Sequence, residues 1–125
     1  MSAGVKRVLV VEDDPDLAAL EAEVLAERGH EVEVAKNGRE ALAAVERKAP
    51  DLILLDMKMP VMNGREFAEE YRKRGPHTAP IVVVTAADDA QRRAAEVGAS
   101  AWMGKPFDPE ALVEKVASLL DPTRR

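Results

Sequence analysis

Short runs of apolar residues alternate with longer amphipathic stretches along this chain of 125 residues. An unbroken apolar run, such as the one at 8–11, predicts a strand that is buried on both faces, as in a parallel sheet. The alternation of polar and apolar residues at 31–35 instead predicts a half-exposed strand. The five predicted strands cover residues 8–11, 31–35, 51–55, 81–84 and 101–103.

The amphipathic stretches carry the signals that begin and end helices. Two of them open with aspartate followed by proline, which predicts an N-cap and the first helical residue. Two others open with asparagine followed three residues later by glutamate, as in a capping box. These capping residues are Asp14, Asn37, Asn63 and Asp108. A shorter and weaker helix is predicted at 89–97. The buried face of the first helix is predicted to consist of Leu17, Leu20, Val24 and Leu25.

Five strands that alternate with five helices predict an α/β fold in which helices cover both faces of a parallel sheet. The pattern alone leaves the strand order open. Any such sheet nevertheless has a crevice at the carboxyl ends of its strands, where the order of the strands reverses. The length predicts a single domain over residues 1–125, with a core at about 6–120 and short tails.

Composition narrows the classes of function. The chain has no cysteine, which excludes disulfides and thiolate metal sites. Its net charge of −5 argues against non-specific binding to nucleic acid, which requires a basic surface. No apolar run reaches the length of a membrane span, and the first residues lack a hydrophobic signal region. We therefore expect a soluble cytoplasmic protein with no direct contact to nucleic acid or membrane.

Polar side chains follow four of the five predicted strands. Asp56 comes directly after four consecutive branched apolar residues, at the carboxyl end of a buried strand. Because Pro15 marks Asp14 as a helix cap, Glu12 and Asp13 remain to face the crevice. The polar residues at the strand ends are Glu12, Asp13 and Asp14 after the first strand, Asp56 after the third, Thr85 after the fourth and Lys105 after the fifth.

Several carboxylates held close together repel one another unless a cation neutralises them. The cluster contains no histidine or cysteine, so zinc and copper are disfavoured, whereas Mg²⁺ suits carboxylates combined with a phosphate group. A carboxylate such as Asp56 can act as a nucleophile toward phosphorus and form an aspartyl phosphate. Lys105 could supply a cation and Thr85 a hydroxyl group for the transferring phosphoryl group.

Two other classes of function stay open on this reasoning. A flavodoxin-like module that binds a nucleotide or small molecule would have a phosphate-binding loop after the first strand, where Glu12, Asp13 and Asp14 would repel an anion. An aspartate-based phosphatase usually has its nucleophile at the end of the first strand, with a second acid two residues later. Retention of a flavin or nucleotide would favour the first class, and multiple turnover of phosphoesters the second.

These residues resemble the receiver domain of two-component response regulators over essentially the whole chain. The segments that carry the resemblance are 8–14, 54–60 with Gly64 after it, 84–86 and 104–107. The resemblance implies a flavodoxin-like (βα)5 fold with three layers and strand order 2-1-3-4-5, in which the second strand lies at an edge. It implies a signalling switch that catalyses its own phosphorylation and slow dephosphorylation, rather than a metabolic enzyme.

The resemblance also assigns roles at the site. Asp56 would accept a phosphoryl group from the phosphohistidine of a histidine kinase or phosphotransfer protein. Asp13, Asp56 and the backbone carbonyl of Lys58 would bind Mg²⁺ directly, and Glu12 would do so through water. Lys105 would pair with the phosphorylated carboxylate, and the peptide bond between Lys105 and the proline after it would be cis.

The expected response lies on the fourth and fifth strands. Thr85 would move toward the phosphoryl group and Trp102 would turn inward with it, which would change the face formed by the fourth helix, the fifth strand and the fifth helix. That face would contact an output partner or effector domain. Glu12 and Trp102 depart from the commonest residues of the family, aspartate and tyrosine or phenylalanine. An indole packed on an exposed strand is the alternative for Trp102. Since only five residues follow Leu120, we expect either a stand-alone regulator or a fragment of a longer one.

Overall fold

Five parallel strands form one sheet in the computed structural model, which describes residues 5–75 and 78–121. The strand order is β2-β1-β3-β4-β5, so the expected order 2-1-3-4-5 is confirmed and β2 lies at an edge. The strands are β1 (Arg7–Val11), β2 (Glu31–Ala35), β3 (Leu52–Leu55), β4 (Ile81–Ala86) and β5 (Ala101–Lys105).

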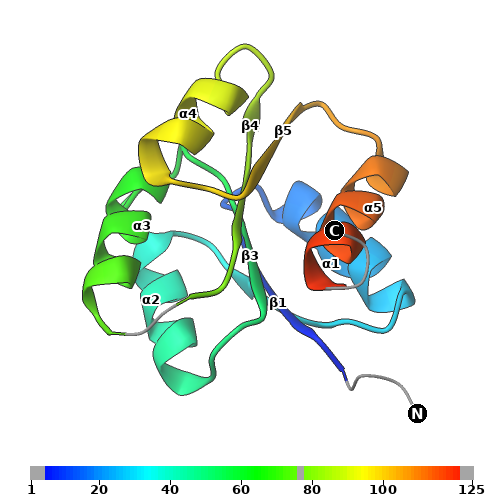
Figure 1. Ribbon diagram of the computed structural model, residues 1–125, viewed down its shortest axis with the longest axis horizontal. Coiled ribbons are helices and arrows are strands. Elements are labelled where there is room, and N and C mark those ends of the chain that lie inside the picture. Colours follow the sequence, from blue (N-terminus) through cyan, green and yellow to red (C-terminus); the bar gives the residue numbers. More distant parts are fainter. Residues whose placement is uncertain (1–4, 76–77, 122–125) are drawn as a thin grey trace.

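Helices cover both faces of this sheet and give the three layers of a flavodoxin-like fold. The layer of α1 and α5 lies on one face, and the layer of α2, α3 and α4 lies on the other (Figure 1). The helices are α1 (Pro15–Glu27), α2 (Gly38–Arg47), α3 (Gly64–Lys73), α4 (Ala90–Val97) and α5 (Pro109–Leu120). Because every connection passes through a helix, the carboxyl ends of all five strands lie at the same edge.

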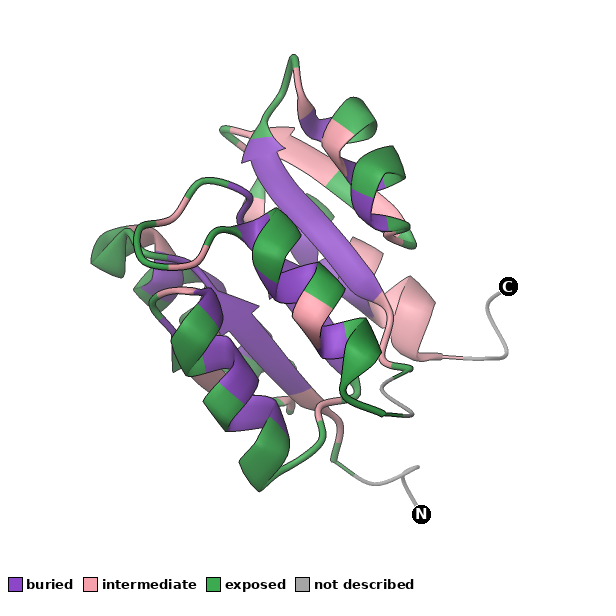
Figure 2. Cartoon of the chain, turned by 90° about the vertical axis from the view of Figure 1, so that its left-hand side faces the viewer, coloured by how far each residue is buried: buried purple, intermediate pink, exposed green. Residues whose placement is uncertain are grey.

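The central strands are buried on both sides, as their unbroken apolar runs predict. Alternate residues face opposite layers: Leu9 and Ile53 pack toward α2, α3 and α4, whereas Val8 and Leu54 pack toward α1 and α5. Figure 2 shows that the helices bury the sides that face the sheet and expose their outer sides. Each fully buried branched side chain contributes about 1.5–3 kcal/mol, so this double core holds the layers together.

The capping signals of the sequence correspond to real caps. Asn63 accepts a hydrogen bond from the backbone N–H of Glu66, whose carboxylate accepts one from the N–H of Asn63, which completes a capping box. Asn37 also caps α2, but there the carboxylate of Glu40 accepts from the N–H of Lys36, one residue earlier. The shorter helix α4 has no side-chain bond at its cap, in keeping with its weaker signal.

The buried face of α1 differs from the predicted one. Its fully buried residues are Ala18, Glu21 and Leu25, whereas Leu20 is 38% exposed, so the prediction for Leu20 was wrong. Leu17 and Leu20 lie on the flank of the helix that borders a pocket, and the side that packs on the sheet is rotated away from them. A glutamate therefore lies where the pattern predicted an aliphatic side chain.

Strand β5 is longer than predicted and continues to Lys105. Gly104 and Lys105 pair with Thr85 and Ala86 of β4, which the apolar pattern of β5 did not indicate. A side chain at Gly104 would meet the Cα atom of Ala87 at 2.5 Å, so glycine permits this close approach of the loop after β4. The extra pairing brings Lys105 to the same edge as Thr85.

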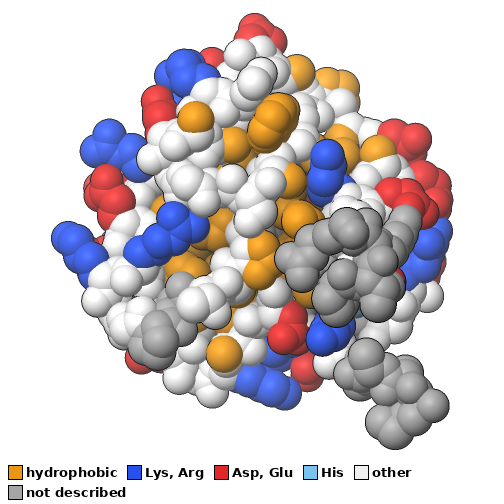
Figure 3. Space-filling view, in the orientation of Figure 1, with side chains coloured by type: hydrophobic (Ala, Val, Ile, Leu, Met, Phe, Trp, Pro, Cys, Tyr) orange, Lys and Arg blue, Asp and Glu red, His pale blue; other side chains and the backbone are white. Residues whose placement is uncertain are grey.

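Charged side chains of both signs are spread over the rim of the face in Figure 3, and apolar side chains lie along its middle, between the two helical layers. The described basic side chains on that face form no continuous patch. Among the described residues, no helix is long and apolar enough to cross a membrane.

Backbone strain at Val61 generates a first prediction. This exposed residue has a φ of 69°, a left-handed conformation that costs a β-branched residue about 1–2 kcal/mol. Glycine adopts it freely but loses more chain entropy on folding, so Val61→Gly should raise the free energy of unfolding by about 0.5–1 kcal/mol in urea titrations. The control Val34→Gly, on strand β2, should lower it. A loss of stability in Val61→Gly would contradict strain at this position.

Candidate functional site

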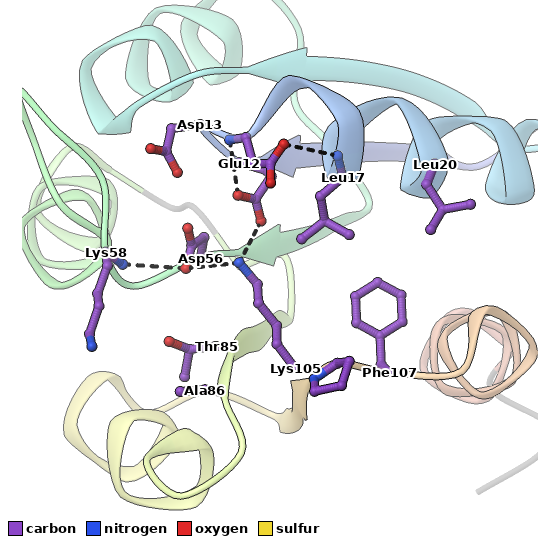
Figure 4. A pocket seen from close by; sticks show the side chains of 12 residues that line it. Glu12, Asp13, Leu17, Leu20, Asp56, Lys58, Thr85, Ala86, Lys105 and Phe107 are labelled. Atoms are coloured by element: carbon purple, nitrogen blue, oxygen red, sulfur yellow. Dashed lines mark hydrogen bonds and ion pairs between the residues drawn. The ribbon is translucent and has the colours of Figure 1, made fainter.

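The carboxyl ends of four strands open into a pocket of about 670 Å³. Acidic residues that follow β1 and β3 form one side, and apolar side chains of α1 and of the segment after β5, Leu17 and Phe107, form the other (Figure 4). Val11 and Leu55 are partners in the sheet, so the residues directly after them, Glu12 and Asp56, emerge side by side. The polar residues that follow these strands therefore come together at one edge of the sheet, as expected.

Three carboxylates converge in this pocket. One oxygen each of Glu12, Asp13 and Asp56 lies within 4.8 Å of the others. Glu12 and Asp56 are only 2% and 5% exposed, whereas Asp13 is open to solvent. Hard oxygen ligands, two of them buried and one accessible, fit a divalent cation such as Mg²⁺ that keeps part of its water.

Lys105 is the cation that the structure places among these acids. Its Nζ atom donates to Glu12 Oε1 at 2.9 Å and lies 3.5 Å from Asp56 Oδ1. Glu12 Oε2 also accepts a hydrogen bond of 3.1 Å from the backbone N–H of Asp14. Glu12 is thus held from two sides, and Lys105 connects the end of β5 to the ends of β1 and β3.

Burial and repulsion raise the pKa values of both buried acids. For Glu12, loss of solvent is the largest cause of the raised pKa, and the charge of Asp56 adds to it, although the hydrogen bond from Lys105 opposes it. For Asp56, burial again raises the pKa most, against the opposing charge of Lys105. Burial opposes the charge of Lys105, but its bonds to these carboxylates prevail and raise its pKa, so it stays protonated.

The backbone around Asp56 is held closely. Its N–H donates to the carbonyl of Val11 at 3.0 Å, and its Oδ1 accepts a 3.3 Å bond from the N–H of Lys58. The first residue of α3, Gly64, packs on the carbonyl of Asp56 so closely that a Cβ atom would lie 2.5 Å from that oxygen. Glycine at this position therefore lets the start of α3 pack against the backbone of Asp56.

Of the other residues predicted for the site, Thr85 and Lys58 border the pocket and Trp102 does not. Thr85 is 2% exposed and borders the same pocket. The side chain of Lys58 extends away from Asp56 (Figure 4). Trp102 is 44% exposed and lies outside this pocket, in a separate hollow between β5 and α5. The peptide bond between Lys105 and Pro106 is cis, as expected.

Sequence reasoning missed one acid near the site. Glu21 of α1 is 1% exposed, and its Oε2 atom is buried without a hydrogen-bond partner. Burial is the largest cause that raises its pKa to about 8, and the negative charge of Glu12 adds to it. The spacing in the sequence could have predicted its burial. Glu21 comes four residues after Leu17 and four before Leu25, which places it on the apolar side of the helix.

Comparison with known proteins relates the chain to one family. The family model of the response regulator receiver domain matches residues 8–117. A response regulator receiver protein of Anaeromyxobacter sp. is 41% identical over 102 residues, which cover 81% of this chain and 43% of that protein. The DNA-binding response regulator MtrA of Mycolicibacterium smegmatis is 39% identical over 117 residues, which cover 92% of this chain and 50% of that protein. The chain spans about half the length of these curated relatives.

Solved structures agree with the fold. The chemotaxis response regulator CheY4 of Vibrio cholerae superposes with a TM-score of 0.85 at 35% identity, over 94% of this chain and 100% of that one. The receiver domain of NtrX from Brucella abortus gives a TM-score of 0.83 at 29% identity, over 92% of this chain and 98% of that one.

The buried acid Glu21 predicts an unusual pH dependence of stability. Its carboxyl group keeps its proton to about pH 8 in the folded protein but only to about 4.5 in the unfolded chain. Its contribution is therefore fully present below 4.5 and is lost as the pH rises to about 8. Between pH 5 and 8, the free energy of unfolding of the wild type should fall on the order of 2–4 kcal/mol more than that of Glu21→Gln.

Urea unfolding at several pH values measures this difference. Glu23→Gln serves as the matched control, because Glu23 is an exposed acid on the same helix. Its pH profile should follow that of the wild type. Parallel profiles for the wild type and Glu21→Gln would show that Glu21 does not hold its proton in the folded protein.

Proposed function

The chain belongs to the response regulator receiver domain family, and we propose that it is a phosphorylation-controlled switch whose phosphoacceptor is Asp56. One observation carries the proposal: Asp56, two further acids and the Lys105 ammonium group meet in one pocket at the carboxyl ends of the strands. The donor would be the phosphohistidine of a histidine kinase or of a phosphotransfer protein.

The chemical step is a transfer between two nucleophiles. A carboxylate oxygen of Asp56 attacks phosphorus, an O–P bond forms, and the P–N bond to the donor imidazole breaks with its electron pair going to nitrogen. The hydrogen bond from the Lys58 N–H orients the attacking carboxylate, and the packing of Gly64 holds the backbone of Asp56. The charge of Lys105 favours the carboxylate form of Asp56, against the burial that raises its pKa.

Asp13, Asp56 and the backbone carbonyl of Lys58 would hold Mg²⁺ directly, with Glu12 acting through water. When bound, Mg²⁺ supplies positive charge to the phosphoryl oxygens. Glu12 and Asp13 provide the negative charge that makes the pocket favourable for a cation.

Lys105 and Thr85 would stabilise the phosphorylated carboxylate. Lys105 Nζ already lies 3.5 Å from Asp56 Oδ1, so a short movement from Glu12 would bring the ammonium group to the phosphoryl oxygens. Thr85 borders the same pocket and would donate its hydroxyl group.

The switch would connect the pocket to an output surface. Thr85 pairs with Gly104 on β5, two residues after Trp102, so a shift of the loop after β4 would be transmitted along β5. We propose that the face formed by α4, β5 and α5 contacts the output partner. Such a shift changes the populations of two conformations rather than creating a new one.

Several wider properties belong to the proposal. The relative MtrA is a DNA-binding response regulator by name. We propose that the acidic domain described here makes no direct contact with nucleic acid, and that DNA binding in a longer protein would be made elsewhere. A cytoplasmic location, slow self-catalysed dephosphorylation and the absence of metabolic turnover also stay predictions. The flavodoxin-like binding module is less favoured, because the buried acids would repel an anionic cofactor.

Phosphorylation by a small donor tests the assignment of Asp56. After incubation with Mg²⁺ and acetyl phosphate, intact-mass spectrometry should show one added phosphoryl group on the wild type and none on Asp56→Asn. Asp16→Asn, which changes an exposed aspartate of the first turn of α1, is the matched control and should be modified like the wild type. Modification that survives in Asp56→Asn would refute the phosphoacceptor.

Trp102 gives a second test, because it is the single tryptophan of the chain. Its fluorescence should change on phosphorylation or on addition of Mg²⁺, since its partly exposed ring lies on the strand that carries Lys105. The change on phosphorylation should be absent in Asp56→Asn. If the emission of the wild type is indifferent to both additions, Trp102 is not part of the switch.

A further inference from the structure

Glu21 is a buried acid for which the proposed phosphotransfer has no use. It lies on the inner side of α1, with 1% of its surface exposed and with Oε2 unpaired. One helical turn before it, Leu17 borders the pocket, and one turn after it, Leu25 belongs to the apolar core. Glu21 therefore lies on α1 between a residue of the pocket and a residue of the core, and its burial makes an unpaired charge costly.

The charged groups that act on Glu21 all belong to the candidate site. Glu12 at the end of β1 and Asp56 after β3 oppose a negative charge on Glu21, whereas Lys105 of β5 favours it. Burial opposes ionisation more than any of these, and it raises the pKa to about 8. With no cation in the cluster, the balance keeps Glu21 neutral near pH 7.

A divalent cation would change this balance. It would place two positive charges among Glu12, Asp13 and Asp56 and cancel the repulsion that Glu12 and Asp56 exert on Glu21. Glu12 and Glu21 are only 2% and 1% exposed, so the interaction between the cluster and Glu21 is weakly screened. A positive charge near a protonated acid favours loss of its proton.

We propose that Glu21 is a proton-releasing group coupled to the acidic cluster: it is neutral when the cluster holds no cation and gives its proton to solvent when Mg²⁺ binds. This inference rests on the proposed function, because it takes the cluster as the Mg²⁺ site. Binding of each Mg²⁺ ion then releases, on average, a fraction of one proton, so the affinity for Mg²⁺ rises with pH. Occupancy of the pocket becomes sensitive to pH through a residue that does not touch the ion.

Titration calorimetry measures the exchange directly. Mg²⁺ is titrated into the wild type near pH 7 in two buffers with different heats of ionisation, and the difference gives the protons released per ion. We expect about half a proton or more for the wild type and at most about half of that value for Glu21→Gln. The exposed control Glu23→Gln should release as much as the wild type. Equal release from the wild type and Glu21→Gln would overturn the inference.

Two further measurements separate this inference from the proposed function. Asp13→Asn should weaken Mg²⁺ binding; if the wild type itself binds no Mg²⁺, the metal site of the proposed function fails. Binding without proton release refutes only the role of Glu21. The carboxyl carbon of Glu21 in the wild type, followed by NMR near pH 7, should shift toward its ionised value on addition of Mg²⁺. This measurement requires no variant, and an unchanged shift would also overturn the inference.

Discussion

Buried negative charge at the carboxyl ends of the strands is the constraint on which this structure depends. Glu12 and Asp56 are almost fully buried, and an uncompensated buried ion costs several kcal/mol. Lys105 compensates both through contacts of 2.9 and 3.5 Å. These contacts exist only because β1, β3 and β5 run parallel in one sheet and therefore end at the same edge. The parallel arrangement of the strands therefore brings together both the buried acids and the lysine that neutralises them.

Much of the fold was predictable because local signals and tertiary packing agree. The run at 8–11 is apolar at every position, and such a segment can be satisfied only between two helical layers. Asn63 and Glu66 define the start of α3 through bonds within one turn, which depend on little outside that turn. The strand order came from the resemblance to receiver domains rather than from the pattern, because apolar runs do not specify their neighbours. The acids at the strand ends were found because parallel strands bring their carboxyl ends together.

The remaining features depend on how elements pack, which a linear pattern does not encode. Successive residues of a helix are separated by about 100°, so the orientation of α1 about its axis decides whether Leu20 or Glu21 is buried. The extension of β5 depends on Gly104 and on the approach of Ala87 from another element. The direction of the Lys58 side chain, away from Asp56, is a rotamer choice in an exposed loop. For α1 and β5 the missing information was the position of neighbouring elements that are distant in sequence.

Glu21 shows why a destabilising residue can be compatible with such a site. A leucine there would pack against the core without a cost of ionisation, so the acid lowers stability near neutral pH. Under the proposed function, however, the pocket holds a cation and then a phosphoryl group, which are opposite in charge. Carboxylates with a fixed negative charge attract the cation but repel the phosphoryl group. An acid that can exchange a proton adjusts the charge behind the pocket by one unit without any movement of the fold, and a buried position is where such an adjustment is least screened.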